Sequence, residues 1–249
     1  MQAGYFTLAN AYHRKGEDNK AFEYYTNTLS LPEPYSSRSH KMIGLIYLEK
    51  DDEEKALIHL KKAFENNKLL FEELVEALAL DHMQMLEKVV GLADMTGKQK
   101  IMFYSQTANN LIRKKEFFSA EKLFLNLLSI EPSYIAAYVN LGNIYSLDVK
   151  THYKAVKYYK KGLTYDKQNE VLLHNLADTY MKLKKYSKGI SIITNTLIKN
   201  NPENPQYHMM AAYALKMMDP DKYREAIRTY ANRAKELEFI LRSRQRMQQ

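Results

Sequence analysis

The chain has 249 residues with 45% hydrophobic content, no Cys, and only 8 Gly and 6 Pro. The absence of Cys excludes disulfides, Cys-ligated metal centres and a thiol nucleophile. So few Gly and Pro argue against a many-stranded β fold, whose turns use these residues. The formal net charge is +8, which permits contact with nucleic acid, anionic lipid or acidic protein segments and does not choose among them.

From the N-terminus onward, the chain predicts pairs of helices in six similar blocks. The blocks begin near residues 2, 37, 101, 135, 170 and 204, and three successive starts differ by 34, 35 and 34 residues. Positions 4, 7, 8 and 11 of each block, which are mostly apolar, lie on one helical stripe. The eighth position is always a small residue: Ala9, Gly44, Ala108, Gly142, Ala177 and Ala211.

This pattern resembles the tetratricopeptide repeat family, whose units pair two helices in about 34 residues. The resemblance covers essentially the whole chain. It implies an all-α fold, a right-handed superhelix of about six repeats, in which an aromatic at position 24 fills the gap to the next repeat. The sequence departs from the family pattern in two blocks, which need one inserted residue before Ala155 and about three before Ala226.

The domain organisation that follows is a single solenoid over residues 1–249. We expect two repeats in 1–70, a degenerate repeat in 71–100, four repeats in 101–240 and a basic tail in 241–249. In the degenerate segment, Leu74 and Leu78 mark one short helix and Leu86 a second, with Asp81 as a cap between them and Gly97 as the end. One long helix is the alternative.

The sequences at the two ends of the chain also lead to predictions. The helical pattern is already running at Tyr5 with no capping residue before it, so we expect the chain to be excised from a longer protein. Met1–Tyr5 lacks the basic region of a signal peptide, which favours a cytoplasmic location. At the other end, apolar residues from Ile227 to Leu241 predict a long final helix that caps the array.

No catalytic motif is present, so the sequence predicts a protein that is not an enzyme and needs no cofactor. His174 and Asp178 stand four residues apart, and His208 occupies the same repeat position as His174 in the next block. These three side chains suggest metal ligands at first sight. We interpret them as polar groove residues instead, since metal sites need three or four convergent ligands.

The sharpest functional prediction concerns amide side chains on the first helix of successive repeats. In the family, groove positions 2, 6, 9 and 13 of this helix hold bound peptides. Here positions 6 and 9 would form two rows, and an amide can pair with both the C=O and the N–H of a peptide. The predicted peptide-binding residues are Gln106, Asn109, Arg113, Asn140, Asn143, Asn175, Asp178, Lys182 and His174.

The resemblance also bears on the partner. The family's carboxylate clamp for chaperone tails of the Hsp90 and Hsp70 type needs basic residues, and only Asn109 and Asn140 match it, so such tails are not expected. A more apolar groove is predicted near Phe6, Met42, Leu45 and Leu48. The basic run Arg242–Arg246 suits a helix C-terminus better than strong phosphate binding, so nucleic acid is not the expected partner.

The predicted function is a non-enzymatic scaffold that binds an extended segment of a partner protein in a concave groove. One alternative is a chaperone for assembly of a secretion or envelope machine. Another is a substrate-recruiting domain of a larger enzyme. No apolar run is long enough to span a membrane.

Overall fold

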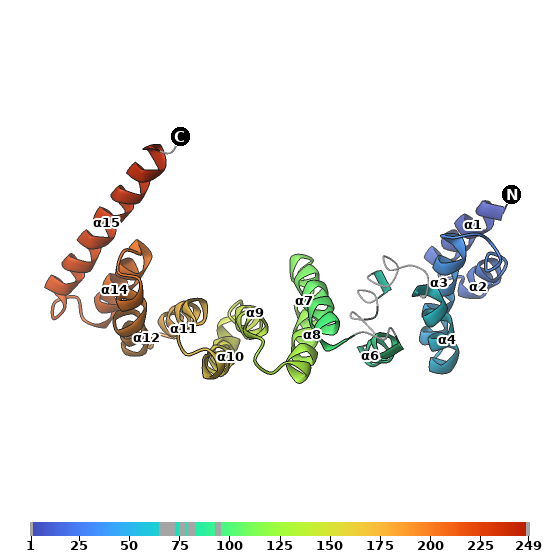
Figure 1. Ribbon diagram of the computed structural model, residues 1–249, viewed down its shortest axis with the longest axis horizontal. Helices are drawn as coiled ribbons and strands as arrows, with labels where there is room; N and C mark the ends of the chain where they lie inside the picture. The colour runs from blue at the N-terminus through green and yellow to red at the C-terminus, as the bar shows by residue number, and fades with distance from the viewer. Residues whose placement is uncertain (1, 65–72, 75–77, 79–82, 93–95, 248–249) are drawn as a thin grey trace. The chain divides into compact units, whose positions relative to one another are not determined.

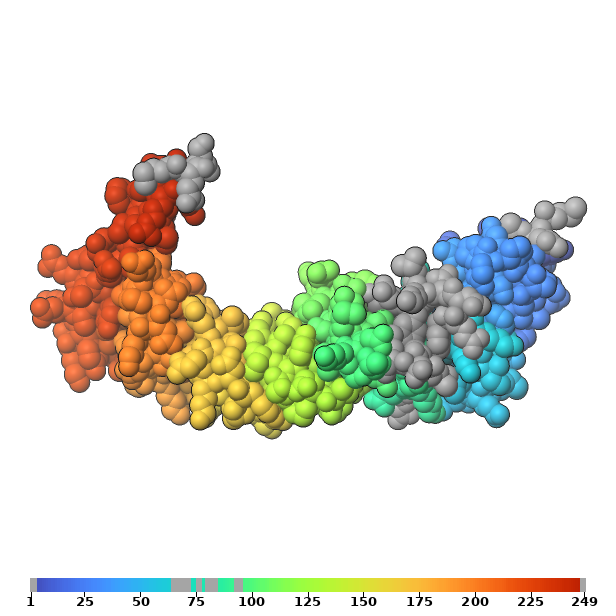
Figure 2. All heavy atoms as spheres, viewed as in Figure 1, coloured from blue at the N-terminus to red at the C-terminus, as the bar shows by residue number. Residues whose placement is uncertain are grey.

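The computed structural model describes residues 2–64, 73–74, 78, 83–92 and 96–247, and these are helices joined by short turns, without strands (Figure 1). Figure 2 draws the heavy atoms of the chain, coloured by residue number from the N-terminus to the C-terminus. The expected all-α solenoid is confirmed. Contacts divide the chain into two compact units, Met1–Ile130 and Glu131–Gln249. We refer to them as the first and second units.

The described residues of the first unit include three helix pairs and one further helix. Within each pair the two helices pack against each other, as expected for the two helices of one repeat. The helices are α1 (Gln2–Arg14) with α2 (Asp18–Thr26), α3 (Tyr35–Glu49) with α4 (Glu53–Phe64), α6 (Met83–Leu92), and α7 (Gly97–Arg113) with α8 (Phe117–Ile130).

The second unit also contains three pairs. The predicted long final helix is confirmed as α15, which has 24 residues. The elements are α9 (Ile135–Tyr145), the short 3₁₀ helix η1 (Val149–Thr151) and α10 (His152–Tyr165); α11 (Glu170–Lys182), α12 (Tyr186–Ile192), the π-helical segment η2 (Ile193–Leu197) and α13 (Ile198–Asn200); then α14 (Pro205–Met218) and α15 (Arg224–Met247).

Four repeats use the same turn between their two helices. One residue at repeat position 15 has a left-handed backbone in each of them: Gly16, Asp51, Lys115 and Lys184, with φ of 74°, 57°, 65° and 58°. The fourth and sixth repeats are the two that the sequence predicted to carry inserted residues. After α9 the chain forms η1 in place of the left-handed turn.

The small residues at repeat position 8 allow close packing of the two helices. A Cβ atom built on Gly44 would lie 2.6 Å from Leu60 Cδ2, and one on Gly142 would lie 2.1 Å from Tyr159 Cε1. Leu60 and Tyr159 occupy position 24 of their repeats and are buried. The second-helix residue therefore rests directly on the backbone of the first helix, and a larger residue at position 8 would displace it.

The predicted end of the degenerate segment is wrong. Gly97 begins α7 rather than ending a helix, because Thr96 is the N-cap and forms a capping box with Gln99. Leu74, Leu78 and Leu86 are buried as expected. Asp81, the predicted cap between the two helices, lies outside the described residues.

Two of the residues predicted for the apolar N-terminal groove, Leu48 and Phe6, have packing contacts within the first unit. Leu48 is buried in the core because it lies four residues after Gly44, on the packing face of α3. Phe6 packs edge-to-face on Tyr25 and Tyr35, with ring centroids 5.8 Å apart in both cases. Binding of a partner at this end stays a prediction.

A histidine pair joins the helices α3 and α4. The Nδ1 atoms of His40 and His59 lie 3.0 Å apart, so one ring must donate a proton that the other accepts. Burial, the neighbouring His59 and Lys62 together lower the pKa of His40 to about 4, against the opposing charge of Glu33. Burial and Lys62 also lower the pKa of His59.

This pair predicts a loss of stability in mild acid. Unfolded histidine titrates near pH 6.5, so between that pH and about pH 4 the unfolded chain binds more protons than the folded chain. The free energy of unfolding should therefore fall as the pH drops through this window and should not change from this cause above it. Urea unfolding at a series of pH values measures the effect. A His40→Gln/His59→Gln variant should lose this part of the pH dependence, and an unchanged slope would contradict the prediction.

Candidate functional site

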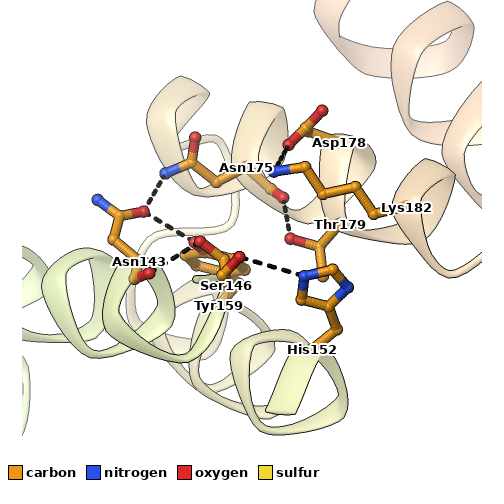
Figure 3. A network of polar contacts seen from close by, with 8 residues as sticks. All are labelled: Asn143, Ser146, His152, Tyr159, Asn175, Asp178, Thr179 and Lys182. Atoms are coloured by element: carbon orange, nitrogen blue, oxygen red, sulfur yellow. Dashed lines mark hydrogen bonds and ion pairs between the residues drawn. The ribbon is translucent and has the colours of Figure 1, made fainter. Parts of the chain in front are cut away.

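Two of the predicted amides meet across neighbouring repeats in the second unit. Asn143 lies near the end of α9 and Asn175 lies in the middle of α11, each on the first helix of its repeat. Asn175 Nδ2 donates a hydrogen bond of 3.0 Å to Asn143 Oδ1 (Figure 3). We call these two residues the amide pair. The contact joins position 9 of one repeat to position 6 of the next, so it crosses the two predicted rows.

Tyr159 of α10 fixes the orientation of Asn143. Its hydroxyl donates to Asn143 Oδ1 at 2.8 Å, while its ring is buried against Gly142. Burial raises the pKa of Tyr159 to about 12, so the phenol keeps its proton at neutral pH. Because both Tyr159 and Asn175 donate to Asn143 Oδ1, this amide can bind in only one orientation.

The two remaining amide atoms of the pair have opposite hydrogen-bonding character. Figure 3 shows Asn143 Nδ2 and Asn175 Oδ1 pointing away from the contacts that hold the pair. One is a donor and the other an acceptor. A peptide main chain offers the complementary C=O and N–H groups at every residue other than proline. The pair therefore carries one donor and one acceptor in fixed positions, which are the two kinds of group that a peptide main chain can pair with.

Neighbouring side chains hold the backbone of the amide pair in place. Thr179 Oγ1 donates to the Asn175 carbonyl at 2.7 Å, and Ser146 Oγ donates to the Asn143 carbonyl at 2.8 Å. His152 Nε2 contacts the Ser146 carbonyl at 3.1 Å (Figure 3). These hydrogen bonds restrict the backbone motion of Asn143 and Asn175 before a ligand binds.

The charged residues predicted for this face pair with each other. Lys182 Nζ lies 2.8 Å from Asp178 Oδ2, one turn apart on α11 (Figure 3). Both side chains are about half exposed, so the pair adds little stability. Its main consequence is that the positive charge of Lys182 is paired with the negative charge of Asp178.

The other predicted site residues are distributed over both units. Gln106, Asn109 and Arg113 lie on α7 of the first unit, and Arg113 Nη1 donates to Asn110 Oδ1 at 3.2 Å. Asn140 lies on α9 of the second unit. The ring of His174 on α11 lies 5.9 Å from the ring of Tyr207. These residues stay predictions as parts of one peptide site.

The histidines considered as metal ligands have other contacts. His208 is buried, and its Nε2 lies 2.8 Å from the Pro202 carbonyl. In the part of the chain that the structure describes, no three or more His, Asp or Glu side chains gather where they could hold a metal ion.

The tyrosine contact to a groove asparagine recurs in the first unit. Tyr25 Oη donates to Asn10 Oδ1 at 2.7 Å, and burial raises the pKa of Tyr25 to about 12. In both units Asn stands at position 9 and Tyr at position 24 of one repeat. The sequence pattern predicts only a packing role for the tyrosines at position 24, and not a hydrogen bond to asparagine. The co-occurrence of Asn at 9 with Tyr at 24 was the signal that could have identified the contact.

Comparisons with known proteins identify the repeats. A family model described as tetratricopeptide repeat matches residues 5–39, and a second with the same description matches residues 38–68. The model for the fourth ARM domain of tetratricopeptide repeat protein 21 matches residues 141–249.

Two human proteins resemble parts of the chain. Tetratricopeptide repeat protein 6 is 31% identical over 114 residues, which are 44% of this chain and 22% of that protein. Protein O-mannosyl-transferase TMTC3 is 30% identical over 97 residues, which are 38% of this chain and 10% of that protein. The chain thus spans less than a quarter of the length of either relative.

Solved structures show the same fold at low identity. The crystal structure of MamA is 12% identical with a TM-score of 0.54, covering 81% of this chain and 97% of that one. The C-terminal part of a repeat-containing protein from Cytophaga hutchinsonii is 14% identical with a TM-score of 0.51, covering 93% and 78%. Among the described helices, none is both long and apolar enough to cross a bilayer. With two successive repeats matched by family models over residues 5–68 and a partial match to tetratricopeptide repeat protein 6, the chain contains tetratricopeptide repeats.

Proposed function

We propose that this chain is a non-enzymatic scaffold that binds an extended segment of a partner protein along the first helices of its repeats. Tetratricopeptide repeats generally mediate protein–protein interaction. The amide pair is the observation that supports binding of a peptide main chain, because its outward donor and acceptor have fixed positions. Asn143 Nδ2 would donate to a main-chain carbonyl of the partner, and Asn175 Oδ1 would accept from a main-chain N–H.

Because Asn143 has a fixed orientation, it can select which hydrogen-bonding group of a peptide it pairs with. A freely rotating amide could offer either its donor or its acceptor to a ligand, whereas Asn143 can offer only its donor. The site would therefore hold a peptide in one chain direction and tolerate many side chains. A terminal carboxylate fits less well, because Lys182 is already paired with Asp178 and neither free atom is cationic.

One alternative has a specific observation in its favour. The 30% identity to part of human protein O-mannosyl-transferase TMTC3 supports a role as the substrate-recruiting segment of a larger enzyme. The binding chemistry at the amide pair would be the same in that case. The two proposals differ only in what is joined to the chain.

A single substitution tests the donor at Asn143. Asn143→Asp keeps an oxygen for Tyr159 and Asn175 but replaces the outward Nδ2 donor with a second acceptor. We expect peptides selected from a random display library on the unchanged chain to bind this variant about tenfold more weakly, which corresponds to one lost hydrogen bond. Isothermal titration calorimetry with one selected peptide measures the change.

Asn10→Asp is the matched control for this experiment. Asn10 occupies the same repeat position and accepts from Tyr25 in the same way, but it lies in the first unit. Peptides that bind at the amide pair should bind this variant as tightly as the unchanged chain. Equal affinity of all three proteins for every selected peptide would contradict the proposal.

A further inference from the structure

Three large apolar side chains are exposed in the turn between α9 and α10 and at the start of α10. Leu147, Val149 and Tyr153 are 65%, 71% and 64% exposed. This is one of the two turns that lack the left-handed residue of the other repeats. Here the η1 helix takes the place of the left-handed residue, and the exposed apolar side chains lie on it and on either side of it. We call these three residues the apolar turn.

Hydrogen bonds hold this turn in its projecting form. The Asp148 carboxylate accepts from the backbone N–H of Lys150 at 2.9 Å. Thr151 Oγ1 donates to the Tyr145 carbonyl at 2.7 Å. The backbone that carries the apolar turn is therefore ordered. Exposing its apolar side chains to water is unfavourable in free energy, and their burial against a partner would be favourable.

Lysines lie within and after the apolar turn in sequence, and the acidic residue inside it, Asp148, accepts a hydrogen bond from the backbone N–H of Lys150. Residues 149–165 contain five lysines and no Asp or Glu. Lys157 and Lys160 follow Tyr153 by four and seven residues, on the same face of α10, and Lys150 precedes it in η1. All three lysines are exposed, and none takes part in an ion pair within the described residues.

We propose that the apolar turn and these three lysines form a binding site for the surface of an anionic lipid bilayer. Apolar side chains would enter the region between headgroups and acyl chains, while the lysines contact lipid phosphates and carboxylates. Nucleic acid fits the lysines but not the apolar turn, because a phosphate backbone would leave Leu147 and Val149 in water. The combination of charge and apolar surface therefore selects a membrane.

A tryptophan reporter tests insertion directly, since the chain has no Trp of its own. Val149→Trp places the reporter in the apolar turn, and Met209→Trp places it at another partly exposed site, 43% exposed on α14. Vesicles of phosphatidylcholine with phosphatidylserine should shift the emission of the Val149→Trp protein to shorter wavelength and leave the Met209→Trp protein unchanged. Equal responses from the two proteins would overturn the proposal.

Two variants separate the apolar and charged contributions in vesicle co-sedimentation. Lys150→Gln/Lys157→Gln/Lys160→Gln should weaken binding roughly fivefold per lysine, or about a hundredfold in total. Leu147→Ser/Val149→Ser/Tyr153→Ser should weaken it at least about tenfold. Lys199→Gln/Lys216→Gln/Lys222→Gln removes the same charge from exposed positions elsewhere in the second unit and should have little effect.

Circular dichroism confirms that each variant is folded before its binding is compared. Three outcomes would overturn the proposal. The unchanged chain could fail to bind anionic vesicles, it could bind vesicles of pure phosphatidylcholine equally well, or it could bind single-stranded RNA while the apolar substitutions have no effect. The Asn143→Asp variant should still bind vesicles, so this test is independent of peptide binding.

Discussion

Replacing Gly142 with alanine should destabilise the second unit by about 2–3 kcal/mol. The new Cβ atom would lie 2.1 Å from Tyr159 Cε1, and the ring cannot move freely because it is buried and its hydroxyl is bonded to Asn143. Displacement of the ring would also remove the bond that orients the amide pair. Urea unfolding followed by circular dichroism measures the loss of stability.

Gly91→Ala is the matched control for this prediction. Gly91 also lies within a helix, α6, but a Cβ atom there would have no other atom within 4 Å. Alanine is the better helix former, so this variant should be more stable by about 0.5–1 kcal/mol. If both glycine variants changed stability in the same direction, the close packing of Tyr159 on Gly142 would be disproved.

The second large effect is expected for Phe124→Ala. Phe124 stands at position 24 of its repeat in α8 and is fully buried. Removing its ring leaves a cavity between α7 and α8, with an expected cost of about 3–5 kcal/mol in the free energy of unfolding. The same urea experiment detects this change as a lower midpoint.

Phe118→Ala tests whether burial causes that loss. Phe118 lies on the same helix but is 68% exposed, and its ring contacts the Lys122 ammonium group at 4.3 Å. We expect a change of no more than about 0.5–1 kcal/mol, since exposed cation–π contacts are weak. A loss as large as that of Phe124→Ala would contradict the assignment of position 24 as the core position.

The helical repeats could be predicted from the sequence because their core positions recur at fixed spacing. Predicted starts at 37, 135 and 170 correspond to helices that begin at Tyr35, Ile135 and Glu170. The start of α7 was missed by four residues, since the capping box of Thr96 and Gln99 precedes the apolar pattern. The capping hydrogen bonds of Thr96 and Gln99, and not the spacing of apolar residues, determine where α7 begins.

The site could be predicted only as a set of polar positions. Asn143 and Asn175 were expected to face a peptide, but the spacing of repeats did not indicate that they would bond to each other. The orientation of Asn143 depends on the hydroxyl of Tyr159, which reaches it from another helix. Such contacts between residues distant in sequence depend on how closely the helices pack, which the residue pattern does not determine.

A crystal structure of the chain with a selected peptide tests the central claim most directly. We predict that Asn143 Nδ2 lies within hydrogen-bonding distance of a main-chain carbonyl of the peptide and Asn175 Oδ1 within that distance of a main-chain N–H. We also expect Tyr159 to keep its bond to Asn143 in the complex. A peptide bound on another face, or held at the amide pair only through its side chains, would contradict peptide binding through the amide pair.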